Sequence, residues 1–399
     1  MNSGKILGGI LLVSCTTIGG GILVLPTNTV AAGFLPTCLS LIICWLFMTY
    51  SALCMLEVTL WSKVETNLIS MARSTLGWPG QLLAWITYIL LLYALISAYL
   101  KACIAWISTL LSPYNGLQIN NNISLPILAL FMGIVIFLGT NIADLLNRLF
   151  SLFLIIAYGT LIINIPNIEL QALHHTNFLN LPVIIPFITT TFGFAIIVPS
   201  LTHYLHQQTK PLVLVIVIGS LIPLIVYILW ELVMLSTLYI EGPYGLSVLS
   251  KSQADGTEIS NALEKVFNNP WLNVSTKSFS ILAILTSLIG VCLSLFHFLA
   301  DGLQLSQKSW TGIQLFLLTF IPPVLSVLLL PTGFVKIISF SSIFIAILLG
   351  LLPIMMVWSG RYYHQKISKF TLCGGKPLLM LGIVFFIYVI FQELYVILV

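Results

Sequence analysis

Two interrupted apolar stretches hold the residues whose types and spacing could bind a small polar solute. The first reads TTIGGGILVLP over residues 16–26, with three consecutive glycines before Pro26. The second reads FITTTFGFAIIVPS over residues 187–200, with three threonines, Gly193 and Pro199. Glycine weakens a helix by about 1 kcal/mol relative to alanine, and proline lacks a backbone donor. Both stretches therefore predict helices that unwind partway along their length.

Unwinding inside a membrane frees backbone groups that lipid cannot satisfy, so something polar must occupy each gap. In the first stretch, the helix that restarts near Ile22 points the positive end of its dipole at the gap, which suits a carboxylate. The freed carbonyls suit an ammonium group or a cation. Together these ligands match the two charges of an amino acid zwitterion. The alternative is that the glycines only allow close helix packing, but the matching interruption at Gly193 favours a binding site.

Lys101, Glu231 and His297 are ionisable side chains that lie within long apolar runs. A lysine near the middle of a span costs about 2.5–3.5 kcal/mol to insert. Lys101 either extends outward to the membrane surface or lies in a polar cavity, where it would carry a coupled proton or replace a metal cation. Glu231 and His297 are further candidates for carrying a proton. For His297, which is near the end of its run, an interfacial position is the alternative.

The elements that position these residues are predicted to be membrane-spanning helices. Of the 399 residues, 59% are hydrophobic and 7% are charged, whereas soluble domains carry about 25% charged residues. Continuous apolar runs of about 20 residues predict α-helices rather than strands. The sequence predicts an all-α integral membrane protein with eleven spans, at residues 6–32, 36–61, 81–111, 125–140, 148–165, 183–203, 212–240, 278–300, 310–331, 336–358 and 377–398.

The two interrupted runs are spans one and six, so they lie five spans apart. Corresponding interruptions in two halves are typical of transporters built from inverted repeats. The sequence thus predicts a first five-helix repeat at 1–165, a second, inverted repeat at 166–358, and an inner loop with an eleventh helix at 359–399. One long outer loop covers 241–277, where ISNALEKVF predicts a short helix over the outer mouth, with a solvated loop as the alternative.

The distribution of lysine and arginine predicts the orientation. With the N-terminus in the cytoplasm, inner segments hold ten of the fifteen basic residues, outer segments hold four, and Lys101 lies within a span. Positive charge concentrates on the cytoplasmic side of membrane proteins. An odd number of spans then places the C-terminus in the periplasm. The net charge of +4 records this topology and gives no indication of nucleic-acid binding.

The sequence lacks the motifs of other membrane-protein classes. No HExxH or GxSxG motif indicates an enzyme, no GxxxxGK[ST] motif indicates an ATP-driven pump, and no filter motif indicates a channel. Seven scattered cysteines form no CxxC pair, and the adjacent His174 and His175 are too few for a metal site. The sequence therefore predicts no cofactor and no metal site. A secondary transporter is the leading interpretation, with a channel or an embedded enzyme as alternatives.

The quoted motifs resemble those of a known family. TTIGGGILVLP and FGFAIIVPSL are similar to the first- and sixth-helix motifs of the hydroxy/aromatic amino acid permeases, the tyrosine and tryptophan permeases of bacteria. CMLEVTLW, LLYALISAYL, LLNRLF, ILWELVML and FHFLADGLQ extend the resemblance over nearly the whole chain. The resemblance implies the broken-helix, five-plus-five fold of the amino acid–polyamine–organocation superfamily. It also implies proton-driven import of aromatic amino acids across the inner membrane by alternating access.

The resemblance further implies a set of site residues. It places the third helix beside the substrate, where Tyr93, Ser97 and Lys101 share one face at i, i+4 and i+8. One departure is Ala195, which stands where the family pattern has histidine. The predicted substrate-binding residues are Thr17, Ile18, Gly19, Gly20, Gly21, Tyr93, Ser97, Thr191, Phe192, Gly193, Phe194 and Ala195.

The predicted coupling residues are Glu57, Lys101, Glu231 and His297. For Glu57, the resemblance implies hydrogen bonds to backbone exposed at the breaks, and an interfacial acid is the alternative. Protons are the expected coupling ion. Sodium stays open because Thr286, Ser287 and Ser294 in span eight offer hydroxyl ligands. Sodium-coupled or exchange-type transport of other neutral amino acids is the alternative function.

Overall fold

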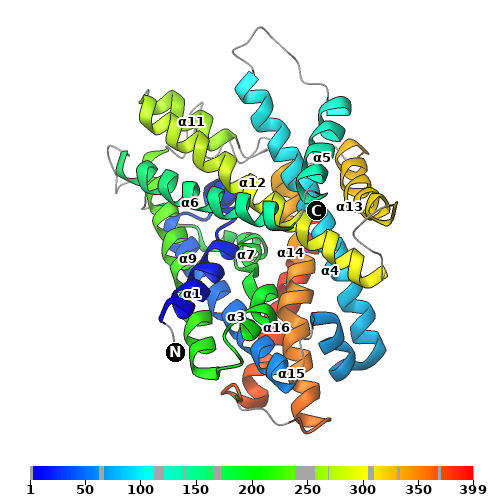
Figure 1. Cartoon of the computed structure of the whole chain (residues 1–399). Coiled ribbons are helices and arrows are strands. Elements are labelled where there is room, and N and C mark those ends of the chain that lie inside the picture. Colours follow the sequence, from blue (N-terminus) through cyan, green and yellow to red (C-terminus); the bar gives the residue numbers. More distant parts are fainter. Residues whose placement is uncertain are drawn as a thin grey trace.

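The protein is helical throughout the part of the chain that the structure, a computed structural model, describes (Figure 1). Among those residues, one isolated antiparallel bridge, between Gly33 and Thr176, is the only β-type pairing. The all-α prediction is therefore confirmed. The described residues are 3–62, 67–111, 121–137, 140–164, 173, 175–238, 257–267, 269–303, 310–329, 333–366 and 370–398.

The helices overlap the predicted spans, but α4, α6 and α12 begin well before the predicted starts at 81, 148 and 278. Short 3-10 segments (η1, η3 and η4) and one π-helical segment (η5) interrupt or precede them. In chain order the elements are α1 (Ser3–Thr17), η1 (Gly20–Val24), α2 (Leu25–Thr29), α3 (Phe34–Trp61), α4 (Leu68–Leu111), α5 (Asn121–Phe137), α6 (Thr140–Asn164), η3 (Phe178–Asn180), α7 (Leu181–Thr191), η4 (Gly193–Ile197), α8 (Val198–Tyr204), α9 (Thr209–Thr237), α11 (Glu258–Phe267), α12 (Pro270–Leu303), α13 (Trp310–Leu329), α14 (Phe334–Ile345), η5 (Ala346–Leu351), α15 (Leu352–Tyr362) and α16 (Gly375–Leu398).

The chain is a multi-pass membrane protein. Among the described residues, eight helices are long and apolar enough to cross a membrane, or nine when the bent pair α1 and α2 is one span. Two further apolar helices, at Ile123–Ile136 and Leu149–Ile163, are shorter. Because these two fall below the length of a full span, the count of eleven stays a prediction, as does the five-plus-five repeat.

Three spans are interrupted. Span one bends by 43° between Gly4–Thr17 and Gly20–Thr29. Span six contains η4 but runs on as one span of 27 residues, Phe178–Tyr204. The tenth span contains η5, whose carbonyls at Leu349 and Gly350 accept from the Ser51 hydroxyl of α3. The sequence analysis predicted the first two interruptions and missed the third.

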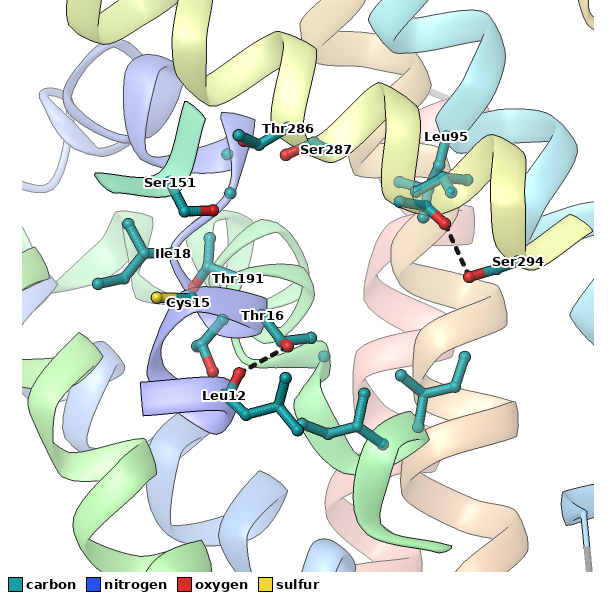
Figure 2. A pocket seen from close by; sticks show the side chains of 18 of the residues that line it. Leu12, Cys15, Thr16, Ile18, Leu95, Ser151, Thr191, Thr286, Ser287 and Ser294 are labelled. Atoms are coloured by element: carbon teal, nitrogen blue, oxygen red, sulfur yellow. Dashed lines mark hydrogen bonds between the residues drawn. The ribbon is translucent and has the colours of Figure 1, made fainter. Parts of the chain in front are cut away.

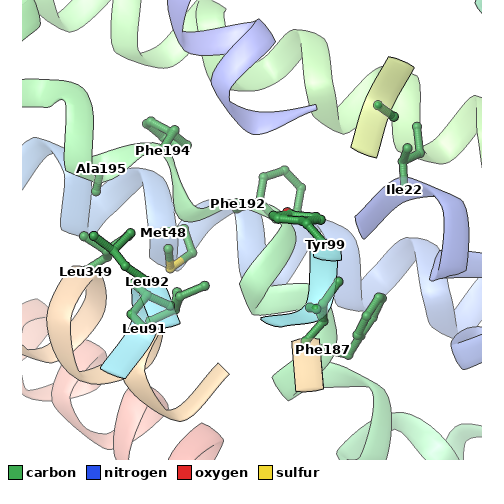
Figure 3. Packing of buried hydrophobic residues seen from close by; sticks show 14 of the residues in the cluster. Ile22, Met48, Leu91, Leu92, Tyr99, Phe187, Phe192, Phe194, Ala195 and Leu349 are labelled. Atoms are coloured by element: carbon green, nitrogen blue, oxygen red, sulfur yellow. The ribbon is translucent and has the colours of Figure 1, made fainter. Parts of the chain in front are cut away.

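Aromatic and aliphatic side chains fill the space between the spans. Helix α1 packs along α9, and α3 packs against α7, α8 and α9, while α12 packs across α4 and α6. Figure 3 shows Phe192, Phe194 and Ala195 among these buried side chains, and all three are 0% exposed. The second interruption therefore lies inside the packed core.

The predicted outer loop is described only in its second part. The helix predicted from ISNALEKVF forms as α11 and packs against α12, with Leu263 fully buried. Residues 239–256 and 268 of this region lie outside the described residues, as does His174.

Candidate functional site

A cavity of about 920 Å³ lies beside the first interruption. Its wall comes from α1, the interruptions of spans one and six, α4, α6, α12 and the tenth span. Figure 2 shows Ile18 and Thr191 on one side of it and Ser287, from α12, on the other. The cavity thus joins segments that are far apart in the sequence around the unwound backbone.

The tyrosine at position 227 holds the two interruptions together. Its hydroxyl, from α9, lies 2.7 Å from the carbonyl oxygen of Thr17 and 3.1 Å from that of Thr191. Both carbonyls are released where their helices end. Because a phenol has one proton, the hydroxyl donates fully to one carbonyl at a time or is shared between them. The two breaks therefore present carbonyl oxygens to a common point.

The first interruption also has a donor beside this pair of acceptors. The backbone N–H of Gly20 donates to the hydroxyl of Ser287 on α12, over 3.2 Å. That hydroxyl in turn donates to the carbonyl of Ala283, over 2.8 Å. The break thus offers both donors and acceptors, the two kinds of ligand that a zwitterion requires.

The glycines of the first break are needed for space rather than for unusual backbone angles. None of the three has a positive φ. A Cβ atom added at Gly20 would lie 2.8 Å from Cε1 of Tyr99, and one at Gly19 would lie 3.1 Å from Oγ of Ser287. At Gly21 it would lie 3.4 Å from Cγ2 of Thr191. Neighbouring helices therefore press directly on this backbone.

The rest of the cavity is uncharged. Among the described residues, its lining contains no acidic or basic side chain. Aliphatic side chains such as Leu92, Leu95 and Ile196 make up most of the wall, with hydroxyls from Ser151 and Ser294 among them. Such a wall admits a neutral side chain and rejects a charged one, because an unpaired charge would be desolvated there.

The cavity extends toward the N-terminal half of α1. Gly8 of that half lines it, together with Leu11 and Leu12 nearer the break, which are 48% and 46% exposed. Beyond the break, Ile22 is 0% exposed, and the ring of Tyr99 packs 6.1 Å from that of the buried Phe334. The cavity therefore runs along α1 on one side of the break, and packed side chains lie on the other side.

Half of the predicted substrate-binding residues line this cavity. The structure brings together Thr17, Ile18, Gly19, Gly21, Thr191 and Gly193. Gly20 faces Tyr99 instead. Phe192, Phe194 and Ala195 turn into the core, so the phenyl rings expected beside the substrate are not in the lining.

The third span presents a different face from the one predicted. Tyr93 donates to the carbonyl of Leu318, and the Ser97 hydroxyl lies 2.6 Å from that of Ser326, so both face α13. Residues two apart on a helix point about 200° apart, and Tyr99 therefore faces the cavity. The polar side chains did not identify the face of α4 that lines the cavity. The helical spacing of Leu92, Leu95 and Tyr99 is a signal that could have identified it.

Three predicted coupling residues lie outside the cavity lining. Glu57 accepts from Nε of Arg361 over 2.6 Å and from the backbone N–H of Leu372 over 2.9 Å. It joins α3 to the end of α15, and among the described residues its hydrogen-bond partners do not include the backbone of either break. Lys101 and His297 are likewise absent from the cavity lining.

Glu231 contacts the helix that follows the first break. It is 0% exposed, and its two carboxyl oxygens lie 3.1 and 3.0 Å from the hydroxyl of Thr29 in α2. The same hydroxyl lies 2.9 Å from the carbonyl of Leu25. Its single proton can serve only one of these acceptors, so the protonation of Glu231 decides how Thr29 bonds.

Comparisons with known proteins identify the family of this chain. The sequence model of the tryptophan/tyrosine permease family matches residues 2–393. Tyrosine-specific transport system 1 of Haemophilus influenzae is 30% identical over 95% of this chain and 94% of its own length. A tryptophan-specific transport protein of Shigella flexneri is 27% identical over 96% of this chain and 93% of its own length. Glutamine transporter 2 of Aliivibrio fischeri is 27% identical over 96% and 97%. This chain belongs to the tryptophan/tyrosine permease family.

Proposed function

We propose that this protein is a secondary active transporter that imports tyrosine, tryptophan or both across the bacterial inner membrane in symport with protons. The observation that carries the proposal is the uncharged cavity at the unwound backbone of span one. The names of the relatives, tyrosine- and tryptophan-specific transport proteins, support the aromatic substrate class. The distribution of basic residues supports a cytoplasmic N-terminus and a periplasmic C-terminus.

In this proposal the two breaks bind the zwitterion. The substrate carboxylate accepts from backbone N–H groups of the glycine run, and the ammonium group donates to the carbonyls of Thr17 and Thr191. The aromatic ring lies against aliphatic side chains such as Leu92 and Ile196. Burial of its surface contributes roughly 25 cal/mol per Å². Six of the predicted residues are proposed to line the substrate site, and we add Tyr99, Tyr227 and Ser287 to this set.

Glu231 is the coupling residue that we propose. A protonated Glu231 donates to the Thr29 hydroxyl, which then keeps its bond to the Leu25 carbonyl. An ionised Glu231 instead accepts a hydrogen bond from that hydroxyl. Protonation is thereby linked to the bonding of α2, which follows the first break. Lys101 and His297 are secondary candidates.

The test is uptake of labelled tyrosine and tryptophan into vesicles that contain the purified protein, with proton and sodium gradients imposed separately. We expect saturable accumulation that follows the proton gradient, with weak competition from alanine and lysine. Accumulation driven by a sodium gradient alone would show that sodium, and not the proton, is the coupling ion. Stronger competition by glutamine than by tyrosine would show that the substrate is not an aromatic amino acid. A flux that does not saturate would indicate a channel.

A further inference from the structure

Two hydroxyl groups bond to the first break. The Tyr227 hydroxyl donates to the carbonyls of Thr17 and Thr191, and the Ser287 hydroxyl accepts from the N–H of Gly20. They come from two different helices, α9 and α12. One is a donor at the carbonyls and the other an acceptor at an amide.

These roles match the two ends of the substrate. An ammonium group would donate to the same carbonyls, and a carboxylate would accept from the same stretch of backbone N–H groups. Neither hydroxyl carries a charge, so each bonds the break more weakly than a charged group would. Substrate can therefore replace both of them, and they can return when it leaves.

We propose that Tyr227 and Ser287 act as internal substitutes for the zwitterion, which satisfy the unwound backbone while the carrier is empty and so permit the empty carrier to change its orientation in the membrane. This inference rests on the proposed transport function. Without the hydroxyls, the break would expose unpaired polar groups during that step, in a region from which water is excluded.

Net uptake and exchange depend differently on this step. Net uptake requires the empty carrier to return after each release. Exchange of labelled for unlabelled substrate across the membrane runs through the loaded carrier in both directions and never requires an empty return. A residue needed only for the empty return therefore affects net uptake and leaves exchange intact.

The test compares Tyr227→Phe and Ser287→Ala with matched controls in the same vesicles. Tyr227→Phe keeps the ring, which packs 5.4 Å from that of Phe192. Its control is Tyr158→Phe, because Tyr158 donates over 3.1 Å to a carbonyl of α9 away from the breaks, at Val226.

The control for Ser287→Ala is Ser294→Ala. Ser294 lies on the same helix, also lines the cavity, and donates to its own helix at Gly290 over 2.8 Å. For all four variants, proton-driven net uptake and exchange at equal substrate concentration are measured per folded protein, with folding checked by gel filtration and thermal unfolding.

We expect each of Tyr227→Phe and Ser287→Ala to lower net uptake by about tenfold, a size typical of losing one buried hydrogen bond. Exchange should change much less, and the affinity for substrate should hold or rise because a competitor for the break is gone. Both controls should keep the parent ratio of net uptake to exchange.

Equal loss of net uptake and exchange in both variants would overturn the proposal, since it would show a purely structural role. Unchanged net uptake would overturn it as well. Failure of the proposed function is a separate result: the parent protein itself would then neither accumulate nor exchange tyrosine or tryptophan.

Discussion

The two interrupted spans carry similar sequence signals but differ in structure. Span one bends by 43° and exposes its unwound backbone to the cavity. Span six unwinds only locally, and the side chains that flank Gly193 are 0% exposed. Phe192 packs edge-on against the Tyr227 ring at 5.4 Å. Large rings on both sides of Gly193 anchor the second break in the core.

This difference separates two tasks. The first break has glycines where the second has phenylalanines, so its backbone rather than its side chains meets the cavity. The second break supplies a carbonyl, at Thr191, to the same point and otherwise acts as a rigid wall. We therefore expect changes at the first break to affect transport, and changes at the second to affect stability.

Gly20→Leu should have the largest effect. A Cβ atom there lies 2.8 Å from Tyr99, so the larger side chain forces α1 and α4 apart and fills the break. We expect uptake to fall by about 100-fold or more, with insertion into the membrane intact. The control is Gly193→Ala, whose Cβ would lie 3.7 Å from its nearest neighbours and should leave uptake within about twofold. If the two substitutions lowered uptake equally, the proposal that only the first break presents its backbone to the substrate would be wrong.

Phe192→Ala should mainly lower stability. Deleting a fully buried phenyl ring costs about 3–5 kcal/mol, because it leaves a cavity in the core. Thermal unfolding in detergent measures this loss. Ile196→Ala, in the same segment but at the cavity wall, should lower the unfolding temperature less and raise KM more. A Phe192→Ala protein of parental stability with a raised KM would place Phe192 in the binding site.

Glu231→Gln should abolish accumulation driven by the proton gradient while exchange persists. The amide N–H₂ group can donate to Thr29, as a protonated carboxyl does, but cannot release a proton. Parent uptake should increase as the outside becomes more acidic, and the variant should lose this response. The prediction fails if the variant accumulates substrate with the parental pH profile, in which case Lys101→Met and His297→Gln are the next substitutions to measure.

Thiol labelling should give the smallest effect, and it tests whether reagents in solution reach the cavity beside the first break. Cys15 is exposed and lines the cavity next to the first break, whereas Cys44 and Cys292 are buried. In a Cys373→Ser background, a small maleimide should react mainly at Cys15, and saturating substrate should slow the reaction several-fold. Labelling that substrate does not slow would place the substrate elsewhere, and Cys15→Ser is the control for the site of reaction.

The sequence was sufficient to predict the helical membrane fold and the first break. An apolar run of about 20 residues forms a spanning helix in lipid, and three glycines before a proline interrupt such a helix. The sequence did not predict which face of a span meets the cavity, because polar and apolar side chains occur on all faces of a buried helix. Tyr93 and Ser97 were chosen for their polarity, and they bond to α13 instead.

Long-range contacts were also beyond the sequence. Glu57 pairs with Arg361, which is 304 residues away, and nothing local indicates that partner. Tyr227 lies in a run of apolar residues in α9, where one tyrosine has no periodic signal, yet it bonds to both breaks. The π-helical segment η5 contains Gly350 and is followed by Pro353, a weaker signal than three glycines, and its carbonyls are bonded by Ser51 from another span.

The uncharged lining of the cavity has an electrical consequence. Neither the described wall nor a bound zwitterion adds net charge, so a loaded carrier with protonated Glu231 crosses without moving charge. The empty carrier returns with Glu231 ionised. During this return the binding site, with its negative charge, changes from facing the negative inside to facing the outside. A potential of 100 mV is worth about 2.3 kcal/mol per elementary charge. The membrane potential would then accelerate the empty return, so net uptake rises with voltage while exchange is insensitive to it.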